Sequence, residues 1–276
     1  MGQEQKVNSG FIQWLRDRLA EPRLAGIDVD SDELIAIHRR ILGEKKMMRE
    51  VVREIYQTCA DLDRRYLSGA GYRVELGAGA SLFKDFYPDV ITTDIKWARH
   101  LDLTIDAQAM PFADASVRAF YGIECFHHLP DAGRFFNELA RTLVPGGGCI
   151  LIEPYYGPVA RLLFKRLFAG EDFDPARKEW NQAASPMRGA NQALSYVVFT
   201  RDRRRFNANH PELSLLLERP LDNYLRYLLS GGLNFRALVP GACAPLLRLC
   251  EFALKPIHRV VALHHVIVLR KNSRPS

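Results

Sequence analysis

The chain has 276 residues, of which 47% are hydrophobic and 25% charged, and its formal net charge is +6. This composition is that of an ordinary globular protein, which excludes wholesale disorder, collagen and coiled coil. No window of about 18 residues is uncharged and apolar, so no membrane-spanning helix is predicted. The amino-terminal residues lack the pattern of a signal peptide. Five cysteines at scattered spacings predict a cytoplasmic location.

The net charge is unevenly distributed along the chain. Residues 1–155 contain 19 Lys/Arg against 23 Asp/Glu, whereas residues 156–276 contain 19 against 9. A basic region of this kind predicts either an anionic partner or a solvated basic surface. The anionic partner could be a phosphorylated substrate, an acidic membrane surface or a nucleic acid.

Residues 1–66 are predicted to form a helical amino-terminal extension, and residues 67–276 a second unit. Within residues 31–65, apolar side chains recur near helical spacing with charged residues between them. These apolar residues are Leu34, Ile37, Ile41, Met48, Val51, Val52 and Ile55.

From residue 72 the pattern changes to short apolar segments. We predict strands at residues 72–76, 90–93, 101–105, 117–123 and 149–153, with a helix at 132–143. Two further segments, 213–218 and 266–269, are also strand-like. Apolar strands that alternate with helices or linkers predict a parallel sheet joined by crossovers.

A glycine-containing loop follows the first predicted strand. Gly77 and Gly79 would let the backbone turn tightly and approach a ligand closely. Asp94 ends the next strand, 15 residues after Gly79, where a carboxylate can accept both hydroxyls of a ribose. A plain turn would also explain the two glycines alone, but the combination predicts a cofactor that contains a nucleoside.

Two residues of this loop distinguish between cofactors. A dinucleotide site requires a third glycine, where this chain has Ser81, and Glu75 would repel a pyrophosphate. A carboxylate instead suits a cationic or zwitterionic ligand. The loop therefore favours S-adenosylmethionine and disfavours an NAD-dependent oxidoreductase.

Further motifs follow in a fixed order at residues 106–116, 126–129, 138–147 and 153–154. With them, residues 70–155 resemble the class I S-adenosylmethionine-dependent methyltransferases of type 11. The resemblance implies an α/β fold with a Rossmann-like seven-stranded, mostly parallel sheet and helices on both faces. To this fold the chain adds its amino-terminal helices and a helical insertion before the last strand. S-adenosylmethionine is the implied cosubstrate, and no metal is expected.

The resemblance also implies a set of cofactor-binding residues. The loop after the first strand would contact the methionine part and the ribose, and later loops would hold the ribose hydroxyls and the adenine. Ser81 and Arg118 depart from the family pattern and leave the loop's shape open. The implied residues are Glu75, Gly77, Ala78, Gly79, Asp94, Ile95, Asp106, Ala107, Gly122 and Glu124.

Three residues are candidates for catalysis. His127 could be a general base, because histidine titrates near neutrality, or it could simply be packed. Glu153 and Tyr155 follow the fifth strand, at the edge where α/β sheets bind ligands, although a structural turn would also explain them. The adjacent His127 and His128 do not predict a metal site, because neighbouring helical residues point in different directions.

Two segments of the basic half stand apart from the motifs. Residues 157–212 are predicted to form a lid, in which residues 201–205 either bind phosphate or carboxylate or are solvated. Residues 221–265 form an insertion whose apolar stretch, 239–254, has four interpretations. It could lie on lipid, line the acceptor pocket, form a dimer surface or pack on its own core.

The leading hypothesis is methyl transfer to a small-molecule or lipid-linked, anionic acceptor, with peripheral contact to an anionic membrane. A nucleic-acid methyltransferase is disfavoured, because residues 123–126 lack the Asn/Asp-Pro-Pro-aromatic motif of amino-group methylation. A non-catalytic binding module is disfavoured, because the cofactor residues are all present. The oligomeric state is left open.

Overall fold

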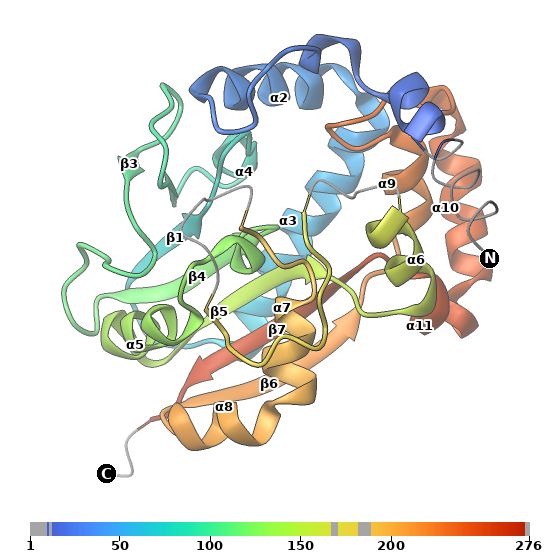
Figure 1. Ribbon diagram of the computed structural model, residues 1–276. Helices are drawn as coiled ribbons and strands as arrows, with labels where there is room; N and C mark the ends of the chain where they lie inside the picture. The colour runs from blue at the N-terminus through green and yellow to red at the C-terminus, as the bar shows by residue number, and fades with distance from the viewer. Residues whose placement is uncertain (1–9, 11–12, 167–170, 182–188, 274–276) are drawn as a thin grey trace.

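A seven-stranded sheet forms the centre of the molecule (Figure 1). The computed structural model describes residues 10, 13–166, 171–181 and 189–273. The strand order is β3-β2-β1-β4-β5-β7-β6, in which β1 to β5 pair in parallel and β7 runs antiparallel to both neighbours. The predicted α/β class is therefore confirmed. The strands are β1 (Tyr72–Leu76), β2 (Val90–Asp94), β3 (Leu103–Thr104), β4 (Val117–Ile123), β5 (Leu143–Pro154), β6 (Leu213–Pro220) and β7 (His264–Lys271).

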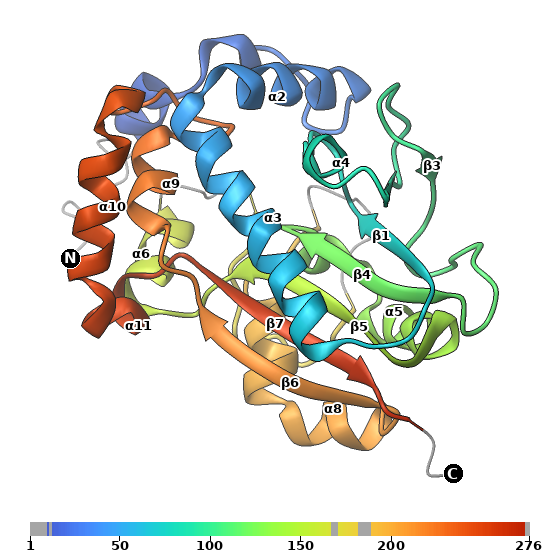
Figure 2. The ribbon, with the colours of Figure 1, turned by 180° about the vertical axis from the view of Figure 1, so that it is seen from behind.

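Helix α3 (Lys46–Tyr66) crosses one face of the sheet, beside α9 (Tyr224–Ser230) (Figure 2). Its apolar side packs on alternate residues of the central strands, including Ala119 and Tyr121 of β4, because successive strand residues point to opposite faces. Arg118 donates to the buried Asp63 of α3 at 2.9 Å. This contact gives Arg118, a departure from the family pattern, a structural role.

The opposite face carries α5 (Ala132–Thr142), α7 (Leu194–Tyr196) and α8 (Arg203–Asn209). Helix α5 begins at Asp131, whose carboxylate accepts the backbone N–H of Arg134 at 3.0 Å and caps the helix. Phe135, Phe136 and Leu139 of α5 are buried against the sheet. Helices therefore cover both faces, as predicted.

The remaining helices lie at the ends of the strands and along one side of the molecule. They are α2 (Asp32–Glu44), α4 (Phe83–Phe86), α6 (Pro158–Arg166), α10 (Ala244–Ala253) and α11 (His258–Val261). The predicted helical insertion before the last strand is confirmed, because α9, α10 and α11 all precede β7. Helix α3 shares its hydrophobic core with the sheet, so the division of the chain at residue 66 remains a prediction.

Several predicted strands have different bounds in the structure, and two of them differ most. The segment at 101–105 is paired only over Leu103–Thr104, because the Asp102 carboxylate itself accepts the backbone N–H of Thr92 at 2.9 Å. The segment at 149–153 is longer than predicted and begins at Leu143. There the register shifts against β4, and Gly146 takes a φ of 80°, which accommodates the Pro-Gly sequence within the strand. Within the described ranges, no helix is both long and apolar enough to cross a membrane.

Candidate active site

The predicted site residues follow strands that end at one edge of the sheet. Strands β1, β2, β4 and β5 are parallel, so their carboxyl ends meet there, and the antiparallel β7 begins at the same edge. The structure therefore brings the Gly77 loop, Asp94, Glu124, Glu153 and His264 to one side of the molecule. This is the edge at which open α/β sheets bind ligands.

The glycine loop is fixed in a conformation that requires glycine. Gly77 and Gly79 have φ values of 63° and 46°, in the left-handed region. A Cβ at Gly77 would lie 2.5 Å from the Cys125 Sγ, so the loop packs directly on the turn after β4. The backbone N–H of Gly79 donates to the Asp94 Oδ2 at 2.8 Å, which ties the end of β1 to the end of β2.

The other predicted cofactor residues surround this loop. Ala78 donates its N–H to the Thr93 carbonyl at 2.8 Å. Ile95 keeps 51% of its surface exposed, which leaves an apolar side chain beside Asp94 on which a base could stack. Asp106 accepts the N–H of Gln108 at 2.8 Å, and Ala107 follows it on the same turn. Gly122 packs closely, since a Cβ there would lie 2.9 Å from the end of the Leu151 side chain.

Glu75 is buried beneath the loop. Burial raises the pKa of Glu75 to about 8, although the Ser81 hydroxyl favours its ionised form. Its Oε2 has no hydrogen-bond partner within the described part of the chain. A buried carboxylate oxygen without a partner is costly, and a cationic ligand would supply one.

Ser81 connects the loop to α3 and α4. Its Oγ lies 2.9 Å from the Tyr56 hydroxyl and accepts the N–H of Phe83 at 2.9 Å. Tyr56 also accepts the N–H of Leu82 at 2.9 Å. Ser81 stands where the family has a third glycine, and its hydroxyl therefore anchors the loop to helix α3.

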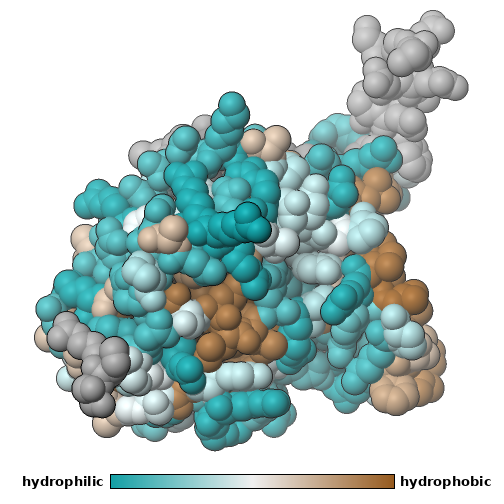
Figure 3. Space-filling view, turned by 90° about the horizontal axis from the view of Figure 1, so that it is seen from below, coloured by the Kyte–Doolittle hydropathy of each residue, from teal (hydrophilic) through white to brown (hydrophobic). Residues whose placement is uncertain are grey.

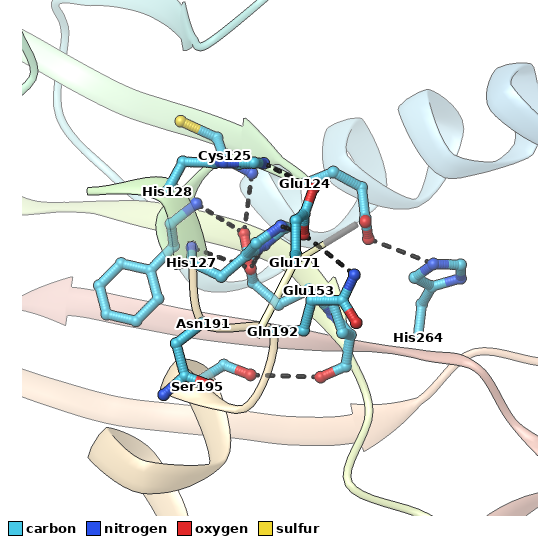
Figure 4. Close-up of polar contacts among 12 residues, drawn as sticks. Glu124, Cys125, His127, His128, Glu153, Glu171, Asn191, Gln192, Ser195 and His264 are labelled. Atoms are coloured by element: carbon cyan, nitrogen blue, oxygen red, sulfur yellow. Dashed lines mark hydrogen bonds and ion pairs between the residues drawn. The ribbon is translucent and has the colours of Figure 1, made fainter. Parts of the chain in front are cut away.

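Glu153 holds the turn after β4 against the end of β5 (Figure 4). The fully buried carboxylate accepts the backbone N–H groups of Cys125, Phe126 and His127 at 3.0, 2.7 and 3.2 Å. Its Oε2 also lies 2.6 Å from the His127 Nδ1. The structure thus brings two catalytic candidates together, in a buried contact that positions the backbone.

His127 lies between two carboxylates. Burial alone would lower its pKa, but Glu153 on Nδ1 and Glu171 on Nε2, at 3.4 Å, together raise the pKa of His127 well above its usual value. Glu171 is held in turn by the Gln192 amide at 2.9 Å. Burial alone would raise the pKa of Glu171. His127, together with His128 and the Gln192 amide, outweighs burial and lowers the pKa of Glu171 to about 2. These contacts favour the imidazolium form of His127, which cannot accept a proton.

Glu124 and His264 form a second pair at this edge (Figure 4). The Glu124 Oε1 lies 3.2 Å from the His264 Nε2, and 37% of the Glu124 side chain is exposed. Burial raises the pKa of Glu124 and lowers that of His264 to about 3. Glu124 also has a φ of 53°, a strained value for a residue that is not glycine. Among Glu124, Glu153 and Glu171, the side chain of Glu124 is the most exposed, although its Oε1 is buried.

The same cluster contains a candidate metal-ligand set. His127, His128 and Glu171 offer ligand atoms that all lie within 4.8 Å of one another. The carboxylates of Glu153 and Glu171, which raise the pKa of His127, favour positive charge at this place. The absence of a metal requirement remains our expectation.

Tyr155 belongs to a different part of the edge. It lines a cavity of about 170 Å³, and its ring packs 5.5 Å from that of His265. His265 Nε2 lies 2.9 Å from the hydroxyl of the buried Ser195. The other residues that line this cavity are Tyr156, Tyr196, Thr200 and Glu218. The structure therefore separates Tyr155 from the His127–Glu153 pair.

The predicted lid, residues 157–212, lies partly outside the described residues, at 167–170 and 182–188. Its arginine run is engaged in ion pairs. Arg201 pairs with Asp202 at 2.7 Å, Arg203 with Glu218 at 2.8 Å and Arg205 with Glu179 at 3.4 Å. These contacts favour a structural role for the run.

Sequence reasoning did not single out Glu171, Gln192 or His264. Two consecutive histidines at the start of an apolar strand are a signal that could have identified His264. Glu171 and Gln192 reach His127 only through the long connection after β5, so no local spacing in the sequence could have indicated them.

Residues 75–151 match the sequence model of a family described as "Methyltransferase domain". This segment contains the glycine loop, Asp94, Asp106 and the turn after β4. Over this segment, the chain is similar to methyltransferase domains, as its sequence motifs predict. The match confirms the predicted resemblance to a methyltransferase family and the assignment as an enzyme.

Solved structures are also similar to the chain. Geranyl diphosphate C-methyltransferase from Streptomyces coelicolor A3(2) has 16% identity and a TM-score of 0.47, covering 92% of this chain and 89% of its own. A candidate methyltransferase from Haloferax volcanii, solved with the activator Trm112, has 12% identity and a TM-score of 0.47, covering 86% and 98%. At these values the similarities carry no conclusion about the acceptor.

Proposed function

We propose that the chain transfers a methyl group from S-adenosylmethionine, bound at the Gly77 loop, to a small-molecule or lipid-linked acceptor in the cytoplasm. The observation that carries this placement is the contact of Gly79 with Asp94, which sets a ribose-binding carboxylate beside a loop that permits close approach. Glu75, with its unpartnered buried oxygen, lies under the same loop and suits the ligand's amino group.

The reaction requires few protein groups. A lone pair on the acceptor attacks the methyl carbon in line, and the carbon–sulfur bond breaks toward sulfur to give S-adenosylhomocysteine. Any acceptor proton leaves to a nearby base. Alignment and exclusion of water can supply most of the rate increase, so a catalytic triad is not needed.

We further propose that His127 and Glu153 are positioning residues. Their contact fixes the turn that carries Glu124 and Cys125, and both are buried. Glu124, partly exposed at that turn, is the better placed group to face the sulfonium or the acceptor. Tyr155 would contact a remote part of the acceptor, in the cavity that it shares with His265.

The charged groups at this edge of the sheet limit the charge of the acceptor group that receives the methyl, which we call the reacting end. The groups that perturb the pKa values of Glu124 and Glu153 are acids and His127, together with backbone N–H groups at Glu153. Arg201, Arg203 and Arg205 are paired elsewhere. We therefore propose that the reacting end is uncharged or cationic, and that any anionic part of the acceptor lies away from Glu124.

Replacing Asp94 by alanine tests the placement of the cofactor. The variant should bind S-adenosylhomocysteine more weakly by more than about 1 kcal/mol, because it loses charged hydrogen bonds to the ribose and the tie to Gly79. Isothermal titration measures the change, and Asp89→Ala, at an exposed acid just before β2, is the control. An unchanged affinity in Asp94→Ala would refute the assignment.

A further inference from the structure

Helix α10 presents its apolar side outward. The side that faces the protein includes Ala244 and Glu251, which are 2% and 3% exposed. On the other side, Leu246, Leu249 and Phe252 are 63%, 64% and 66% exposed. A surface helix of a globular protein ordinarily has the reverse arrangement, with apolar residues toward the core.

An ion-pair network fixes this orientation. The buried Glu251 accepts the backbone N–H of Arg226 at 2.9 Å and its Nε at 2.7 Å. Arg226 in turn donates twice to Glu54 of α3, at 2.7 Å each. Turning α10 over would leave the buried Arg226 without one of its two carboxylate partners, which is unfavourable. The contacts of Glu251 with Arg226 therefore hold the apolar side of α10 outward.

The exposed apolar side chains continue beyond α10. Thirteen large hydrophobic residues are exposed within the described ranges, and six of them fall within residues 238–260. Such clustering differs from the single exposed apolar residues that are common on protein surfaces. We call the six the apolar edge, and Figure 3 shows hydrophobic surface on the side where α10 and α11 lie. They are Leu238, Leu246, Leu249, Phe252, Ile257 and Val260.

Cations accompany the apolar edge. Arg248, Lys255 and Arg259 are exposed and lie between its members in the sequence. The Lys255 ammonium lies 5.4 Å from the centre of the Phe252 ring. Arg248 pairs with Glu54 at 2.9 Å and with Glu50 at 3.5 Å, and Lys255 lies 3.8 Å from Asp222. Within residues 238–262 the one acid, Glu251, is buried and paired, so the exposed charges that this segment itself contributes are positive.

We propose that the apolar edge docks on the surface of an anionic lipid bilayer. Apolar side chains that enter the interface, flanked by Lys and Arg, match the properties of peripheral membrane helices. A second copy of the chain fits less well, because a two-fold contact would place the same cations opposite one another. A nucleic acid fits less well, because aliphatic side chains offer neither stacking nor hydrogen bonds to bases. The proposal does not depend on methyl transfer.

The test is co-sedimentation of the full chain with vesicles of equal parts phosphatidylcholine and phosphatidylserine, and with pure phosphatidylcholine vesicles. We expect binding to the anionic vesicles that falls at least about tenfold in Leu249→Asp/Phe252→Asp, because the inserted apolar area is lost. Lys255→Gln and Arg259→Gln should each reduce anionic binding about fivefold, with little change in folding. The matched control is Leu103→Asp, at an exposed leucine of β3, which should bind as the wild type does.

Three results would overturn the proposal. The first is equal binding of the wild type to neutral and anionic vesicles, or no binding to either. The second is unchanged binding in the charge variants and in Leu249→Asp/Phe252→Asp. The third is a dimer, in analytical ultracentrifugation, that Leu249→Asp/Phe252→Asp converts to a monomer, since the apolar edge would then belong to a second copy. The circular dichroism spectrum of each variant, compared with that of the wild type, shows whether its fold is retained.

Discussion

Glu153→Ala is expected to lower the free energy of unfolding by about 3–5 kcal/mol. The substitution removes the acceptor of three backbone N–H groups and leaves the His127 imidazolium with one carboxylate fewer in a fully buried place. Urea denaturation of both proteins measures the difference. Glu179→Ala, which removes an exposed ion pair with Arg205, is the control and should change stability by less than about 0.5 kcal/mol.

The free energy of unfolding that is lost in Glu153→Ala should depend on pH. Burial alone would raise the pKa of Glu153, but His127 and the backbone N–H groups together lower it below the ordinary 4.5, so its contribution is lost as pH falls through that lowered value. The pKa of His127 is raised above 6.5, so its contribution is lost as pH rises through the raised value. The difference in stability should therefore be greatest between about pH 4.5 and 6.5. A difference that grew steadily toward alkaline pH would contradict the assigned pair.

The second large effect is expected in Gly77→Ala. The new Cβ would lie 2.5 Å from the Cys125 Sγ, and a φ of 63° disfavours any residue with a Cβ. We expect affinity for S-adenosylhomocysteine, measured by isothermal titration, to fall at least about tenfold, because the loop must move away from the turn after β4.

Two further variants test whether the contact with Cys125 causes the loss of affinity in Gly77→Ala. Gly43→Ala, in helix α2, meets no atom within 4 Å and should bind normally while gaining about 0.5–1 kcal/mol of stability. Adding Cys125→Gly to Gly77→Ala removes the clash and should restore part of the affinity, leaving the cost of the backbone conformation. If the double variant bound no better than Gly77→Ala, the clash would not be the cause.

The strands whose carboxyl ends form the candidate site were predictable from the sequence for a physical reason. Strands β1, β2 and β4 are short, largely apolar runs, and the group that each positions lies at its end or within a few residues of it, as Asp94 lies at the end of β2. Parallel pairing then brings these groups together without further information. The seven strands and the helical insertion were predictable from the same local patterns.

The cluster of Glu124, His127, Glu153, Glu171 and His264 was less predictable, because its members come from segments that are far apart in the sequence. Glu171 reaches His127 from a segment with no regular pattern, and His264 meets Glu124 only because β7 runs antiparallel beside β5. The protonated state of His127, which argues against its predicted role as a base, follows from these distant carboxylates. The outward apolar side of α10 likewise depends on the pairing of Glu251 with Arg226.

Titration of the wild-type chain with S-adenosylhomocysteine and, separately, with NAD tests the central claim most directly. The Gly77 loop, the unpartnered Glu75 oxygen and the Asp94 carboxylate predict saturable binding of S-adenosylhomocysteine at one site and no binding of NAD. Binding of NAD alone, or no binding of S-adenosylhomocysteine by the folded chain, would contradict the claim.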